Sequence, residues 1–127
     1  MITMTVNDLM NVVPVLREMA EKPFKGAITF KLARLMREID KEMTLFEESR
    51  QKLAEKYALR DDNGQIVLTE DGNIRLQEDK VQECNEEMIS LLTTEVEINA
   101  DKISASAFDN IEIAPNQAIA IDILIDY

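Results

Sequence analysis

The longest helical pattern in the chain runs from Gly26 to about Leu59, and it sets most of what this sequence can fold into. Its apolar residues return every three or four positions, the spacing that places side chains on one face of an α-helix. A helix of about thirty residues is roughly 45 to 50 Å long, longer than a compact domain of this size is wide. We therefore expect part of the apolar stripe to contact another protein or a second copy of the chain; the alternative is a core helix within one chain. The predicted interaction residues are Ile28, Leu32, Leu35, Ile39, Met43 and Phe46.

A second helical pattern precedes the long one. Apolar residues recur with helical spacing over 9–19, and Asn7 is predicted to be the N-cap of this helix. Pro14 interrupts the pattern, so the helix either kinks before it or consists of two short pieces. A proline and a glycine in the connector 22–26 predict a turn between neighbouring helices. Residues 1–60 are therefore expected to form a long helical hairpin.

The middle of the chain carries turn signals. Aspartate, asparagine and glycine cluster at 61–64 and again at 70–73, on either side of a short β-branched run. This arrangement predicts a β-hairpin over 61–77, with a type I′ turn at Asp71-Gly72. The hairpin would be the core of a small antiparallel β element, which the alternating residues at 96–98 could join.

Residues 78–127 are predicted to contain a helix, a short strand and a C-terminal helix. Helical periodicity returns from Asp79 to about Thr93, and the alternation at 95–98 is typical of a strand. The segment 115–125 has two interpretations from its residues alone. Pro115 favours a helix that begins there, whereas isoleucine at every second position from 119 to 125 favours a strand.

Composition bounds the class of protein. The chain has 127 residues, 46% of them hydrophobic, which predicts a single packed domain over 1–127. Its 25 acidic and 14 basic residues give a net charge of −11, which disfavours direct binding to nucleic acid or to anionic membranes. The chain has neither an apolar run long enough to span a membrane nor the pattern of a signal peptide, so we expect a cytoplasmic location.

The residues that usually carry catalysis are scarce. Histidine is absent, and three glycines form no phosphate-binding loop. Adjacent carboxylates such as Glu86 and Glu87 point about 100° apart on a helix and do not share a pocket. The segment 59–70 matches part of a calcium-loop pattern, but Leu59 occupies the first ligand position. We therefore predict no enzyme activity, no cofactor and no metal site; Cys84, the single cysteine, is predicted to be a packing residue.

The order of these features resembles a family of small acidic proteins of unknown function encoded by tailed bacteriophages and prophages. The resemblance covers most of the chain and rests on helix and turn patterns. These are Val6–Leu9 through Val13–Leu16, then Phe46–Tyr57, Asp71–Asn73, and Ile113–Pro115 leading to Ile121–Asp122. In such sequences the C-terminal run after the proline behaves as a helix, so the resemblance implies a helix for 115–125. It also implies the cytoplasm of a bacterial host.

These observations predict an α+β protein, predominantly helical, with a long helical hairpin and a small antiparallel β element. The leading hypothesis is a non-enzymatic phage accessory protein, and a homo-oligomer, that binds another protein during virion assembly or inhibits a host defence factor. One alternative is an acidic DNA mimic that blocks a host nucleic-acid-binding enzyme. Another is an oligomeric sponge that sequesters a nucleotide signal. The candidate anion-binding residues for the sponge are Arg34, Arg37, Arg60 and Arg75.

Overall fold

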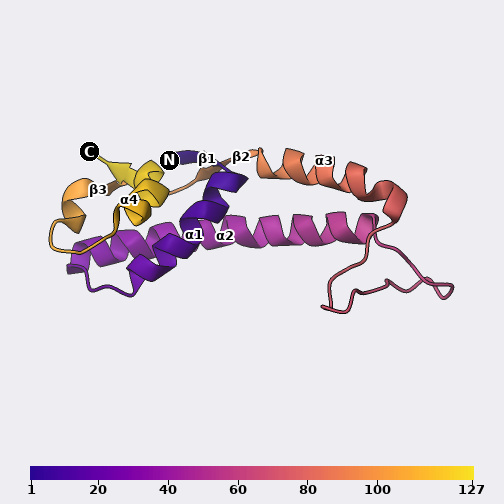
Figure 1. Ribbon diagram of the computed structural model, residues 1–127. Coiled ribbons are helices and arrows are strands. Elements are labelled where there is room, and N and C mark those ends of the chain that lie inside the picture. The colour runs from indigo at the N-terminus through magenta and orange to yellow at the C-terminus, as the bar shows by residue number, and fades with distance from the viewer. The chain divides into compact units, whose positions relative to one another are not determined.

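The computed structural model describes residues 1–127 and shows an α+β chain that is predominantly helical (Figure 1). The elements in order are β1 (Ile2–Thr5), α1 (Val6–Ala20), α2 (Gly26–Lys56), the 3-10 helix η1 (Glu78–Lys80), α3 (Val81–Leu92), β2 (Glu95–Ile98), β3 (Ile103–Ser104), η2 (Ala105–Phe108), α4 (Pro115–Ile121), η3 (Asp122–Leu124) and β4 (Ile125–Asp126). The chain divides into two compact units. The first unit contains Met1–Thr44 and Thr94–Tyr127, and the second unit contains Leu45–Thr93.

Helix α1 begins one residue after Thr5, which is its N-cap. The Thr5 hydroxyl accepts a hydrogen bond from the Asp8 amide (3.1 Å), and the Asp8 carboxylate accepts one from the Thr5 amide (3.0 Å). This reciprocal arrangement satisfies two amides that the helix itself leaves unpaired. The prediction of Asn7 as N-cap is therefore wrong, because Asn7 already lies inside the helix.

Pro14 does not divide α1 into two helices, so that alternative is also wrong. The helix is continuous from Val6 to Ala20 with Pro14 on its exposed side. Its opposite side is buried at Leu9, Val12, Val13, Leu16 and Met19. Burial of this apolar face on both sides of the proline offsets the one hydrogen bond that the proline cannot donate.

The small antiparallel sheet pairs β1 with β2. Ile2 lies opposite Ile98 and Met4 lies opposite Val96, and the side chains of Ile2, Met4 and Ile98 are buried. The predicted strand at 95–98 is confirmed, but its partner is the N-terminal strand and not the 61–77 region. A second, parallel pair joins β3 to β4, with Ile103 opposite Ile125.

The C-terminal segment confirms the helical interpretation for most of its length. Pro115 is the first residue of α4, where a missing amide hydrogen costs nothing. The helix places Ile121 in the core and packs against α1 (Figure 1). Only the last part of the alternating run, Ile125–Asp126, is a strand.

Helix α2 is confirmed from Gly26 to Lys56. In the first unit its buried side chains Leu32, Leu35 and Ile39 join one core with residues of α1, both sheets and the C-terminal elements. The guanidinium of Arg17 in α1 lies 3.6 Å from the Asp40 carboxylate of α2, at the edge of this core.

The predicted hairpin over 61–77 is confirmed only at its tip, where Leu68 and Ile74 form an antiparallel bridge across the turn. The rest of the segment has no extended strands and forms a closed arrangement. Three isolated antiparallel bridges join Ala58 to Leu76, Arg60 to Ile66, and Leu68 to Ile74. The Leu59 amide donates to the Arg75 carbonyl (2.7 Å), the Val67 amide to the Leu59 carbonyl (2.9 Å), and the Arg75 amide to the Val67 carbonyl (2.9 Å). The three donor residues are spaced eight apart along the chain. Each one also accepts a hydrogen bond from another, so the three bonds form a closed ring. We call residues 57–80 the three-turn module.

The first two turns of the module follow the same hydrogen-bond pattern. In the second turn the Gly72 amide donates to the Thr69 carbonyl (3.0 Å) and the Thr69 amide to the Asn73 carbonyl (2.7 Å). Gly72 has φ +82°, while Asp71 has no positive φ. A type I′ turn needs two such residues in succession, so that prediction is wrong. In the first turn Gly64, with φ +79°, occupies the equivalent position.

Candidate protein-binding surfaces

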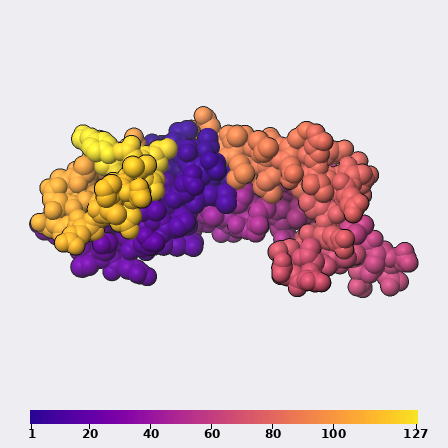
Figure 2. All heavy atoms as spheres, in the orientation of Figure 1, coloured from indigo at the N-terminus to yellow at the C-terminus, as the bar shows by residue number.

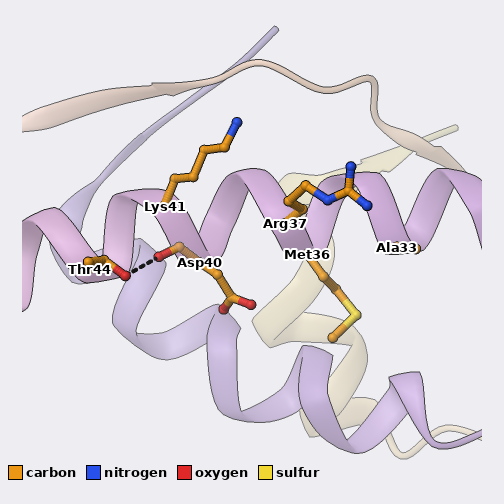
Figure 3. A pocket seen from close by; sticks show the side chains of 6 residues that line it. All are labelled: Ala33, Met36, Arg37, Asp40, Lys41 and Thr44. Carbon is orange, nitrogen blue, oxygen red and sulfur yellow. Dashed lines mark hydrogen bonds between the residues drawn. The ribbon is translucent and has the colours of Figure 1, made fainter.

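A groove of about 580 Å³ runs along α2 in the first unit (Figure 3). It is lined by Ala33, Met36, Arg37, Asp40, Lys41 and Thr44. The Thr44 hydroxyl donates to the Asp40 carbonyl (3.0 Å) within the helix, and the Arg37 and Lys41 side chains extend to the side opposite Met36 (Figure 3). One turn before the groove, Phe30 is 79% exposed. An aromatic ring left in water beside arginines is typical of a contact surface.

A second groove, of about 610 Å³, lies within the second unit. It is formed by α2, the three-turn module and α3. Its lining residues are Arg50, Gln51, Ala54, Leu68, Gly72, Asn73, Ile74, Leu76, Cys84, Asn85 and Met88. The volume falls in the range that proteins use for small molecules or for the side chains of a partner.

The second groove is lined by apolar and polar side chains in about equal measure. The apolar part includes the half-buried Ile74, Leu76 and Met88. Leu68 also lines the groove, with 57% of its surface exposed. The Arg50 guanidinium already binds the Glu47 carboxylate (2.7 Å), so its charge is balanced within the chain. The groove therefore suits an apolar group better than a free anion.

Cys84 lies in this groove as a buried thiol. Burial raises the pKa of the Cys84 thiol, and the negative charge of Glu87 raises it further. A thiol with a raised pKa is a weak nucleophile at neutral pH. Cys84 therefore contributes apolar contact area to the groove, as the sequence indicated.

Comparison with family models, with curated proteins and with solved structures found no match to this chain. None of its helices combines the length and the apolar character needed to cross a membrane.

The predicted interaction stripe of α2 lies mostly inside the chain. Leu32, Leu35, Ile39 and Phe46 are buried, and Ile28 and Met43 are half-buried. Because α1 and the sheets of the first unit cover Leu32, Leu35 and Ile39, these side chains do not form a free surface. The exposed large apolar residues of α2 are Phe30 and Leu45, on other sides of the helix. Self-association through this stripe stays a prediction, and the burial of most of its residues within the chain argues against it.

The four candidate anion-binding arginines are divided between the units. Arg34 and Arg37 belong to the first unit, and Arg34 lines a pocket of about 220 Å³ with Lys31 and Asn99. Arg60 and Arg75 belong to the second unit, where the Arg60 guanidinium donates to the Gly64 carbonyl (3.0 Å). Neither unit by itself brings all four together.

The segment with partial calcium-loop character is the first turn of the three-turn module. The Asp61 carboxylate accepts hydrogen bonds from the amides of Asn63 (2.9 Å) and Gln65 (3.0 Å). This carboxylate therefore holds the turn itself. Sequence reasoning missed the module, although Gly64 and Gly72, and Ile66 and Ile74, recur at the eight-residue spacing that reveals it.

Proposed function

We propose that this protein is a non-enzymatic accessory protein of a tailed bacteriophage or prophage that binds another protein in the bacterial cytoplasm. The observation that carries the proposal is the groove of the second unit. The Leu, Ile and Met side chains that line it can accept apolar side chains of a partner, and methionine adapts its shape to them. The amides of Gln51, Asn73 and Asn85 are the polar groups that would orient the partner. The phage origin is supported by the resemblance of the helix and turn patterns.

The test compares two leucines of almost equal exposure. Leu68 lines the groove and is 57% exposed, while Leu45 lies on α2 outside it and is 56% exposed. Each is replaced by glutamate, and the tagged proteins are cross-linked in bacteria that carry the phage or prophage. Mass spectrometry then identifies cross-linked partners. A partner captured by the wild type and by Leu45→Glu, and lost from Leu68→Glu, is the expected result.

Two results would contradict the proposal. The first is equal capture of every partner by the Leu68→Glu variant and the wild type, because the groove would then have no role. The second is turnover of a substrate by the purified protein that a single carboxylate substitution abolishes, because the protein would then be an enzyme.

A further inference from the structure

Charge is segregated along this acidic chain. Residues 22–37 contain five basic side chains (Lys22, Lys25, Lys31, Arg34, Arg37) and no acidic one. Residues 61–87 contain nine acidic side chains (Asp61, Asp62, Glu70, Asp71, Glu78, Asp79, Glu83, Glu86, Glu87) against Arg75 and Lys80. The first segment lies in the first unit and the second segment in the second unit. One copy of the chain therefore offers both a cationic surface and an anionic surface.

The cationic surface is a face of α2 centred on Phe30. We call Phe30, Lys31, Arg34 and Arg37 the basic face; all four are exposed. No hydrogen bond or ion pair engages the charged groups of Lys31, Arg34 or Arg37. Their spacing of three and four residues places Arg34 and Arg37 on either side of the line that runs from Phe30 along the helix. The face thus presents an aromatic anchor among free cations.

The anionic surface is the solvent side of α3, which lies at the surface of the second unit (Figure 2). We call Gln82, Glu83, Glu86 and Ile89 the acidic face; all four are exposed, and Ile89 is 61% exposed. Glu86 accepts a hydrogen bond from the Gln82 amide (3.4 Å), and Glu83 lies 3.4 Å from the Lys80 ammonium. The acidic face therefore resembles the basic face in having one exposed apolar side chain beside exposed charged ones, but the charges are of opposite sign.

We propose that two copies of this chain associate by packing the basic face of one copy on the acidic face of the other. The basic face from Phe30 to Arg37 and the acidic face from Gln82 to Ile89 have the same length, about 10 Å along their helices. In this interface Phe30 of one copy packs against Ile89 of the other, which removes both side chains from water. Arg34 and Arg37 then lie near Glu83 and Glu86. A pair related by a two-fold axis makes this contact twice. The proposal goes beyond the partner-binding groove, since Ile89 and Glu86 do not line that groove.

The test measures the dissociation constant for self-association by sedimentation velocity at low and physiological salt. Arg34→Glu with Arg37→Glu is one variant, and Glu83→Lys with Glu86→Lys is the other. Each is expected to weaken association at least about tenfold, because like charges then meet. A chain with all four substitutions keeps the wild-type net charge and is expected to regain association within about threefold. The control, Glu95→Lys with Glu97→Lys, reverses two exposed glutamates of β2 and should not impair association.

Variants without a charge change complete the test. Phe30→Gln and Ile89→Gln remove the apolar anchors from exposed positions, and each is expected to weaken association; circular dichroism verifies that helix content is kept. A monomeric wild type at about 100 µM protein in low salt overturns the proposal. Charge reversals without effect overturn it too, as does a failure of the fourfold variant to recover association.

Discussion

The ion pair between Lys56 and Glu87 joins the end of α2 to α3 within the second unit. The Lys56 ammonium donates a hydrogen bond to the Glu87 carboxylate (2.9 Å) and lies 5.1 Å from the centre of the Tyr57 ring. The hydrogen bond from Lys56 lowers the pKa of Glu87 below its ordinary value of 4.5. A lowered carboxyl pKa stabilises the folded state above that ordinary value, and this contribution is lost as pH falls through the lowered pKa.

We therefore expect the Glu87→Gln variant to lose part of the acid sensitivity of the protein. The difference between urea midpoints at pH 7 and pH 3 should be smaller in the variant than in the wild type. Carbon-detected NMR titration measures the Glu87 pKa directly, and Lys56→Met should return it toward 4.5. An unchanged Glu87 pKa in Lys56→Met would show that the ion pair is not formed.

Gly72 offers a test of backbone conformation at a single residue. Its φ of +82° disfavours any residue with a Cβ atom, although a Cβ at this position would meet no other atom within 4 Å. Gly72→Ala should therefore lower the free energy of unfolding by about 1 to 2 kcal/mol through backbone strain alone. Gly26→Ala is the control, because Gly26 has equal space and no positive φ. Equal effects of the two substitutions in urea unfolding would contradict this explanation.

Among the elements, the start of α1 distinguishes two N-cap assignments. The Thr5 side chain accepts the Asp8 amide hydrogen, whereas Asn7 is exposed within the helix. Thr5→Ala should lower the free energy of unfolding by about 1 kcal/mol, the usual cost of losing a capping side chain. Asn7→Ala should change it by less than about 0.5 kcal/mol. Chemical denaturation measures the free energy of unfolding of both variants. A larger decrease for Asn7→Ala than for Thr5→Ala would show that Asn7 is the N-cap.

The ring of the three-turn module makes a prediction about hydrogen exchange. The amides of Leu59, Val67 and Arg75 each donate to the carbonyl of another member of the ring, so displacing any one of these residues breaks two of the three hydrogen bonds and weakens the ring as a whole. We expect similar protection factors at the three amides by NMR. The Glu70 amide, at an exposed turn, should exchange much faster. Protection factors that differ among the three by more than about tenfold would show that the ring does not open as one unit.

Local residue patterns predicted the helices better than the pairing of strands. Gly26 and the apolar period located α2, and Pro115 located α4 even though the isoleucines after it alternate. The start of the chain also alternates, with Ile2 and Met4 buried and Thr3 exposed, but its partner β2 begins at Glu95. A pairing across that many residues depends on the whole core and has no local signal. The three-turn module was missed for a related reason, since its ring closes between Leu59 and Arg75.

At the scale of the whole molecule, sequence periodicity identified the apolar face of α2 but not what covers it. The expectation of a second chain came from the length of the helix. In the structure the first unit covers Leu32, Leu35 and Ile39 with α1, the sheets and the C-terminal segment. The surfaces that we propose for partners are the groove of the second unit and the two charged faces. Which surface is available thus depends on long-range packing, which a single helix pattern does not encode.

Two substitutions on α2 measure which side of the helix is interior. Leu35 is fully buried, and Phe30, five residues earlier, is 79% exposed. Leu35→Ala should lower the free energy of unfolding by about 2 to 5 kcal/mol, since it leaves a cavity in the core. Phe30→Ala should change it by less than about 0.5 kcal/mol when the chain is dilute enough to be monomeric. If the Phe30 substitution were the more costly in dilute protein, this side of α2 would be interior, and the basic face would not be available to a second copy.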